Sequence, residues 1–380
     1  MHFKQHYLQM ANTFESYIKN YLYAKYGESA EELYSLSYIL QYLVHKTKSV
    51  NRGAKARSSF ANLYAIYVMV EDYLNHGFDQ NGNFEQYEGA QYSVLHKRQL
   101  ELPFGAKLQN HALNSRMNDE FFKFFPTQQG VYPIMRDRET QRYWFNENYL
   151  KINVGHKTIN IATDIINIID AYVKAKQDSF KHFIEQCQQL QEIEGKDPEG
   201  VKTFILSLLA PNVDARLFEI VSYSILKYYY RGQHIYWGFS MDNLKQEDLH
   251  LYKTGRTNAN DGGIDFVMKP LGRFFQVTET LDFKKYFLDI EKIEKFPVSF
   301  VIKSEESEDD LRRKLETDAI KTYVVRKVVD NYMSCIEEII NIPKLKDCLD
   351  GLEANGLVSD VLKEIILQSK VEFNYEEDED

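Results

Sequence analysis

Long apolar runs and paired cysteines are both missing from this 380-residue chain. No stretch of roughly eighteen apolar residues occurs, which excludes a membrane-spanning helix. The three cysteines, Cys187, Cys335 and Cys348, are far apart and show no CxxC spacing. Neither a disulfide framework nor a zinc site is therefore expected, and free thiols fit a reducing compartment. The first residues show no basic stretch leading into an apolar block, so no secretory signal is predicted and a cytoplasmic location is expected.

Several well-known catalytic motifs are also missing. The chain has no GxxxxGK[ST] phosphate loop, no HExxH and no GxSxG, and its ten histidines form no ligand-spaced pair on an obvious site. The net charge of −10 argues at first against a nucleic-acid partner. Binding depends on local fields, however, and part of the acidity lies in the terminal segment 376–380, which is expected to be a solvated end.

The first half of the chain has a mainly helical pattern. Apolar residues recur at three- and four-residue spacing in 30–43, and again in 58–73. Residues 129–160 look partly extended, and 163–190 returns to a helical pattern. The clearest linker is the polar segment 194–200, where we predict a domain boundary.

The second half changes to mixed α and β. A helix is predicted over 212–230, then a short strand at 235–237, then two extended segments that flank the turn 269–272. A helix over 282–295 and a strand over 298–302 follow, with further helices to the end. The predicted fold class is therefore mixed α+β, with a helical region (1–198), a core (199–330) and C-terminal helices (331–380).

A glycine turn in the core segment 255–268 precedes a carboxylate. Gly262 and Gly263 allow a ligand to approach the backbone closely. Asp265 follows at the start of an apolar strand, where its carboxylate could hold a hard cation such as Mg²⁺. Turn chemistry alone would also explain an aspartate at this place.

The next strand carries polar residues that fit the same site. A four-residue loop, 269–272, would set Asp265 opposite Gln276, and a two-residue loop would set it opposite Thr278. Either loop places the three side chains on one face, because side chains alternate along a strand. Gln276 lies within an otherwise apolar strand, where it needs a partner such as a metal-bound water or a neighbouring backbone group.

The pattern Gly262-Gly263-Ile264-Asp265 followed by Phe275-Gln276-Val277 resembles the Mrr-type branch of the PD-(D/E)XK nuclease superfamily over about residues 212–303. The resemblance implies a restriction-endonuclease-like core, with a central mixed sheet flanked by helices. It also implies that Asp265 and Glu219, on the preceding helix, bind Mg²⁺, for which Mn²⁺ could substitute, and that Gln276 replaces the usual second acid. No other small-molecule cofactor is expected.

One position departs from the family pattern. The family's lysine falls at Thr278, which cannot supply an ammonium group. The ammonium group could come from a neighbouring segment, through Lys253, Lys284 or Lys285. Alternatively, Glu279 and the metal could be enough for catalysis without it. The alternative is a domain that has lost catalysis and only binds DNA.

Two basic segments are predicted to contact DNA phosphates or bases despite the acidic total. The first contains Lys46, Lys48, Arg52, Lys55 and Arg57, and the second contains Arg136 and Arg138. Arg256, beside the glycine turn, is a third candidate, for a phosphate near the cut. Solvated surface segments would show the same composition.

The function implied by the resemblance is Mg²⁺-dependent hydrolysis of phosphodiester bonds in double-stranded DNA. A type II restriction endonuclease, site-specific and working as a homodimer on palindromic sites, is the first expectation. A defence nuclease of low specificity and an inactive DNA-binding module are the alternatives.

Overall fold

The computed structural model describes residues 2–48, 56–80, 82–106, 108–193, 197–211, 213–254, 264–323 and 325–373. It divides into two compact units, Met1–Phe183 and Ile184–Asp380. The division falls inside a long helix, α7 (Ala162–Ile193), ahead of the linker predicted from the sequence. Among the described residues, no helix is long and apolar enough to cross a membrane.

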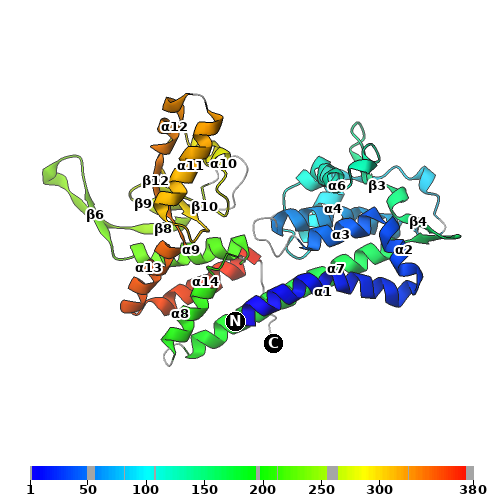
Figure 1. The fold of residues 1–380 in the computed structure, drawn as a ribbon, viewed down its shortest axis with the longest axis horizontal. Coiled ribbons are helices and arrows are strands. Elements are labelled where there is room, and N and C mark those ends of the chain that lie inside the picture. The colour runs from blue at the N-terminus through cyan, green and yellow to red at the C-terminus, as the bar shows by residue number, and fades with distance from the viewer. Residues whose placement is uncertain are drawn as a thin grey trace. The chain divides into compact units, whose positions relative to one another are not determined.

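The first unit is mainly helical (Figure 1). Its α-helices are α1 (His2–Tyr26), α2 (Ser29–Leu36), α3 (Tyr38–Lys48), α4 (Ala56–Asn75), α5 (Tyr92–Glu101), α6 (Met117–Phe124) and most of α7. Its strands are β1 (Ala90–Gln91), β2 (Ile134–Asp137), β3 (Arg142–Phe145), β4 (Lys151–Val154) and β5 (Lys157–Asn160). These strands form one three-stranded sheet, in the order β1-β3-β2, and the hairpin β4-β5.

Helical spacing of apolar residues accounts for the core of this unit. The predicted inner side of the segment 58–73 is buried along α4, from Phe60 to Val70, within one apolar cluster. The segment 30–43 forms two helices, α2 and α3, because the backbone of Ser37 is extended between them. The interpretation of residues 129–160 as partly extended is confirmed by β2 to β5.

The second unit is a sheet with helices. Its α-helices after α7 are α8 (Pro198–Ser207), α9 (Ala215–Tyr230), α10 (Phe283–Lys292), α11 (Glu308–Thr322), α12 (Arg326–Met333), α13 (Ile342–Ala354) and α14 (Val358–Phe373). Its strands are β6 (His234–Trp237), β7 (Lys245–Asp248), β8 (His250–Lys253), β9 (Phe266–Lys269), β10 (Arg273–Thr278), β11 (Val298–Ile302) and β12 (Ile336–Ile340).

Five of these strands form a mixed sheet in the order β12-β11-β10-β9-β8. The pairs β8-β9 and β9-β10 are antiparallel, whereas β10-β11 and β11-β12 are parallel. Helix α10 makes the crossover between β10 and β11. The order in this sheet is a helix, a three-stranded meander, a helix and a strand, but the first strand of the meander is β8 and not the strand predicted at 235–237.

Helices cover both faces of this sheet. Side chains of α10, α11 and α12 form one apolar cluster with Val298, Phe300 and Ile302 of β11. On the other face, Tyr223 of α9 packs against Phe266 of β9 with ring centroids 5.2 Å apart. Figure 1 shows α10, α11 and α12 grouped together on their side of the strands.

The structure corrects two expectations for the second unit. Residues 331–380 are not helices alone, because Ile336–Ile340 forms β12 and completes the sheet beside β11. The strand predicted at 235–237 exists as β6, but it pairs with β7 in a separate two-stranded sheet. A core boundary at residue 330 would therefore cut through α12 and separate β12 from its neighbour.

Candidate active site

Strand direction brings the predicted site residues to one edge of the sheet. Lys253 ends β8, Asp265 comes just before β9 begins, and Thr278 ends β10. Because β8, β9 and β10 alternate in direction, these three positions share an edge. Glu219 comes to this edge from α9, and Lys285 comes from α10.

The register decides between the two loop lengths considered for the hairpin. Phe275 pairs with Phe266, so the next step of the ladder sets Asp265 beside Gln276, as the four-residue loop predicts. The backbone N–H of Asp265 donates to the carbonyl of Phe275 at 3.0 Å. The N–H of Val277 donates to Oδ2 of Asp265 at 2.7 Å, so the carboxylate takes the place of a backbone acceptor.

The β8 side fixes Asp265 as well. The N–H of Thr254 donates to the Asp265 carbonyl at 2.9 Å, and the Thr254 hydroxyl donates to the same oxygen at 3.0 Å. Asp265 is therefore held from β8 and from β10 at once. The backbone of Asp265 is fixed on the β8 side and its carboxylate is fixed on the β10 side, which leaves little conformational freedom to be lost on binding.

Opposing charges meet around Asp265. Burial of the carboxyl group, followed by the nearby carboxylate of Glu219, raises the pKa of Asp265, which lies at about 8. The hydrogen bond from the Val277 N–H lowers this pKa, as do the ammonium groups of Lys253 and Lys285. Two acids that repel each other at a half-buried place are an arrangement that a divalent cation would relieve.

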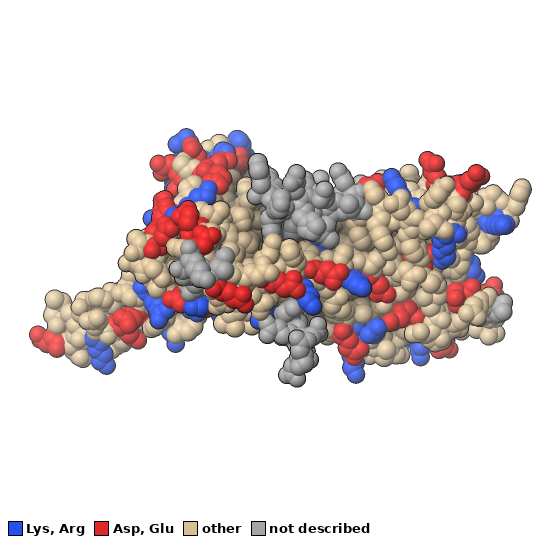
Figure 2. All heavy atoms as spheres, turned by 90° about the horizontal axis from the view of Figure 1, so that it is seen from below, with Lys and Arg blue, Asp and Glu red and all other residues tan. Residues whose placement is uncertain are grey.

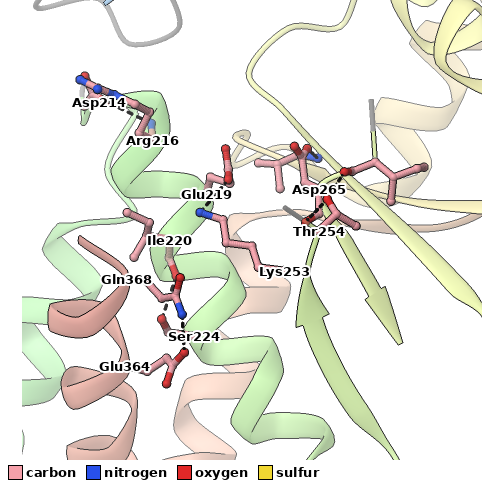
Figure 3. Close-up of polar contacts among 12 residues, drawn as sticks. Asp214, Arg216, Glu219, Ile220, Ser224, Lys253, Thr254, Asp265, Glu364 and Gln368 are labelled. Carbon is pink, nitrogen blue, oxygen red and sulfur yellow. Dashed lines mark hydrogen bonds and ion pairs between the residues drawn. The ribbon is translucent and has the colours of Figure 1, made fainter. Parts of the chain in front are cut away.

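Glu219 and Lys253 form an ion pair beside Asp265. Oε1 of Glu219 lies 3.0 Å from Nζ of Lys253, and both side chains are about one-fifth exposed. Figure 3 shows the two side chains pointing toward each other, with Asp265 and Thr254 next to them. Lys253 therefore points into the site, which was one of the three ways considered to supply the missing ammonium group.

Gln276 has a polar atom without a partner. Its side chain is 8% exposed, and its Nε2 donates weakly to the Val277 carbonyl at 3.4 Å. Its Oε1 is buried and meets no hydrogen-bond donor among the described residues. A buried amide oxygen needs a partner, and a cation or a cation-bound water at this place would provide one.

The position of the missing lysine is approached by another lysine. Thr278 is buried, and its Oγ1 accepts a hydrogen bond from Nζ of Lys285 at 3.3 Å. Lys285 stands in the first turns of α10, which begins after Asp282 caps the helix by accepting from the N–H of Lys284. Of the two α10 lysines proposed from the sequence, Lys285 is the one whose ammonium group contacts Thr278.

Glu279 forms a buried ion pair. Its Oε1 lies 2.7 Å from Nζ of Lys303, whose side chain is only 2% exposed and also donates to the carbonyl of Val213. Sequence reasoning missed Lys303. The signal was its place directly after β11, as Glu279 stands directly after β10, because parallel strands end at the same edge.

Replacing Lys303 by methionine is expected to lower the free energy of unfolding by about 3 kcal/mol, because removing one partner of a buried ion pair is strongly destabilising. Urea unfolding of the full chain measures the change. Lys314→Met is the matched control, since its pair with Glu306 is about half exposed and is worth at most about 1 kcal/mol. Equal losses in the two variants would contradict a structural role for Lys303.

Lys46 does not belong to a basic surface. It is 2% exposed, and its ammonium group lies 2.7 Å from Oε1 of Glu120. Asn62 donates to the other oxygen of Glu120 at 2.7 Å. The prediction that Lys46 contacts DNA phosphates is therefore wrong, because the side chain is used inside the first unit.

The other predicted DNA contacts remain predictions. Arg138 is exposed in the turn between β2 and β3, whereas Arg136 is half-buried and donates to the carbonyl of Asn114 at 3.1 Å. Lys48 ends α3 and Arg57 stands in the first turn of α4, but their side chains lie outside the described part. The positions that fall wholly outside the described residues are Arg52, Lys55, Arg256 and the glycines Gly262 and Gly263.

On the face drawn in Figure 2, the described lysine and arginine side chains alternate with aspartate and glutamate side chains, and they form no continuous basic stripe there. Within the described residues, no three histidine, cysteine, aspartate or glutamate side chains gather as a metal-binding group. The donors that the site offers are two carboxylates, Glu219 and Asp265, and the amide oxygen of Gln276. Mg²⁺ accepts few protein ligands and keeps several waters, so this set fits it.

Comparisons with models of known families, with curated proteins and with solved structures give no match to this chain. The resemblance to PD-(D/E)XK nucleases therefore rests on the residues named above.

Proposed function

We propose that this chain is a Mg²⁺-dependent endonuclease that hydrolyses phosphodiester bonds of double-stranded DNA, with a PD-(D/E)XK-like core. The observation that carries the proposal is the set of groups at one sheet edge. Two carboxylates, Glu219 and Asp265, meet the ammonium groups of Lys253 and Lys285 there, beside the unpartnered amide oxygen of Gln276.

The element order supports the same proposal. The order is helix α9, the meander β8-β9-β10, the crossover α10 and the parallel strand β11, as in the core of that superfamily, with the separate hairpin β6-β7 between α9 and β8. Asp265 directly precedes the second strand of the meander, and Gln276 and Thr278 lie two residues apart in the third. This is where the family pattern carries its aspartate and its acid-x-lysine pair.

Each residue has a role in the proposed reaction. Glu219 and Asp265 would hold Mg²⁺, which lowers the pKa of a bound water and polarises the scissile phosphate when it is present. Gln276 orients a water through its amide oxygen. Lys285, at the Thr278 hydroxyl, offsets the negative charge that develops on the phosphate during attack. Lys253 neutralises Glu219 until DNA and metal bind.

The raised pKa of Asp265 predicts how the stability of the protein changes with pH. Its pKa of about 8 lies above the value of about 3.9 in an unfolded chain. Between these values the folded state binds a proton that the unfolded state does not, so the metal-free protein loses stability as pH rises toward 8. Mg²⁺ competes with that proton, and its affinity should rise over the same range.

Thermal unfolding at pH 5 to 8, in chelator and in Mg²⁺, measures both effects. In chelator the melting temperature should fall with rising pH, and Asp265→Asn should flatten this slope. The stabilisation by Mg²⁺ should grow with pH in the wild-type chain only. A pH slope that Asp265→Asn leaves unchanged would contradict the assignment of the raised pKa.

A type II restriction endonuclease, acting as a homodimer on a specific site, is the form of this activity that we propose. Digestion of a mapped plasmid in Mg²⁺, followed by sequencing of the ends, tests it. Discrete fragments with a common end sequence are expected. A smear would indicate a nuclease of low specificity. Plasmid that is bound but not cut would indicate a non-catalytic module. The observation that favours such a module is the threonine at position 278, where the family pattern has a lysine.

A further inference from the structure

A separate hairpin projects from the second unit. Strands β6 and β7 pair with each other and with no other strand in the described part of the chain. We call residues 231–248, which contain both strands, the arm. Every residue of the arm is exposed except Ile235, which is half-buried. Figure 1 shows β6 extending away from the other elements of its unit.

The tip of the arm has a defined shape. A Cβ atom on Gly238 would lie 2.0 Å from the carbonyl oxygen of Asn243, so the close approach that forms the tip requires glycine there. Residues Met241–Asn243 form a short 3-10 turn. On β6, Trp237 donates through Nε1 to Glu247 at 2.5 Å, and its ring meets the edge of Phe239. Trp237 is therefore held by a hydrogen bond and by a ring contact.

Large apolar side chains cover this tip. The most exposed is Phe239, at 96%, followed by Met241 at 84% and Tyr236 at 62%. Leu244 is 45% exposed and Trp237 is 41% exposed. In Figure 2 the projecting part is mostly uncharged. An isolated two-stranded hairpin is marginally stable in water, and an exposed apolar cluster of this kind marks a surface that another molecule covers.

We propose that the arm packs against a second copy of this chain. Charge decides against DNA as the occupant: the arm carries Arg231 and Lys245 against Asp242, Glu247 and Asp248, a net charge of −1 with its histidine neutral. A segment that enters DNA needs basic side chains to offset phosphate repulsion. Packing against a protein surface does not require basic side chains on the arm.

The available area fits a dimer. Full burial of an aromatic side chain removes about 150–250 Å² from water, and the arm offers five large apolar side chains. Burying the arms of two copies would remove on the order of 1,000 Å² of apolar surface from water. The surfaces that the arms cover would add to this, so the total buried area reaches the range of about 1,200–2,000 Å² for a stable interface. A two-fold axis uses both arms equally and closes the assembly. This inference names a surface for the homodimer of the proposed function, and its observations come from the arm and not from the nuclease site.

Sedimentation velocity of the full chain over a hundredfold concentration range tests the proposal. The wild-type chain is expected to form a dimer. Phe239→Ser combined with Met241→Ser should weaken the dimer at least a hundredfold without changing the circular dichroism spectrum. Leu271→Ser combined with Leu288→Ser is the matched control, because these leucines are exposed elsewhere in the same unit, and it should remain dimeric.

A photo-crosslinker attached to Met241→Cys identifies the occupant. The three native cysteines are buried, so the label goes to the arm. In a mixture of isotopically light and heavy protein, crosslinks between light and heavy chains are expected. A wild-type chain that stays monomeric at every concentration would overturn the proposal, as would an arm variant that dimerises normally. Loss of DNA binding in an arm variant that remains dimeric would overturn it in favour of a DNA wedge.

Discussion

Asp265→Asn is expected to reduce Mg²⁺-dependent DNA cleavage by about 10³-fold or more, because metal-held charge stabilisation is worth several kcal/mol. The change removes one of the two carboxylates at the sheet edge but keeps the size of the side chain. The initial rate of plasmid cleavage at saturating Mg²⁺ measures the effect. DNA binding should be at least as tight as in the wild-type chain, because a negative charge near the phosphates is lost.

A folding control accompanies this prediction. In chelator at pH 8, Asp265→Asn should melt at a higher temperature than the wild-type chain, because the variant carries no carboxylate at this half-buried place. Loss of cleavage together with a gain in stability would separate a functional role from a structural one. A variant that cleaves DNA at the wild-type rate would remove Asp265 from the active site.

Lys285→Ala is expected to lower the cleavage rate about 100-fold, the usual effect of removing one group that stabilises transition-state charge. Its ammonium group stands at Thr278 Oγ1, in the place of the lysine that the family pattern would have there. Single-turnover rates at saturating enzyme report the chemical step, while DNA affinity should change less than threefold or so, as for one phosphate contact.

Two further variants make this prediction specific. Lys284→Ala is the matched control on the same turn of α10, and it should cleave at nearly the wild-type rate. Thr278→Lys placed in the Lys285→Ala background returns an ammonium group by the family's own route and should recover part of the lost rate. Equal losses in Lys284→Ala and Lys285→Ala would mean that only net charge matters, and Lys285 would lose its assigned role.

The sequence predicted the pairing of Asp265 with Gln276 as one of two alternatives, because period-two alternation is a local property. Asp265 and Gln276 flank a short turn, and the two loop lengths left only two partners for Asp265. The structure selects the longer loop. Hydrophobic periodicity likewise predicted α4, α7 and α9, whose burial follows from their own residues.

Long-range pairing lay outside what the sequence could reveal. Lys46 stands in a basic segment that is typical of a surface, but its ammonium group pairs with the distant Glu120, which also accepts a hydrogen bond from Asn62. The strand Ile336–Ile340 contains two adjacent glutamates, and Arg273 of β10 pairs with both of them. Composition alone did not mark that segment as part of the sheet. Lys303 reaches Glu279 only because β10 and β11 run parallel.

Direct measurement of metal binding tests the central claim most closely. Mn²⁺ gives a paramagnetic signal when free, so its binding to the full chain with a DNA duplex present can be followed by titration at pH 8. A site that Mg²⁺ competes for is expected in the wild-type chain, and Asp265→Asn should lose it. Equal numbers and affinities of sites in the two proteins would contradict a metal site at Asp265.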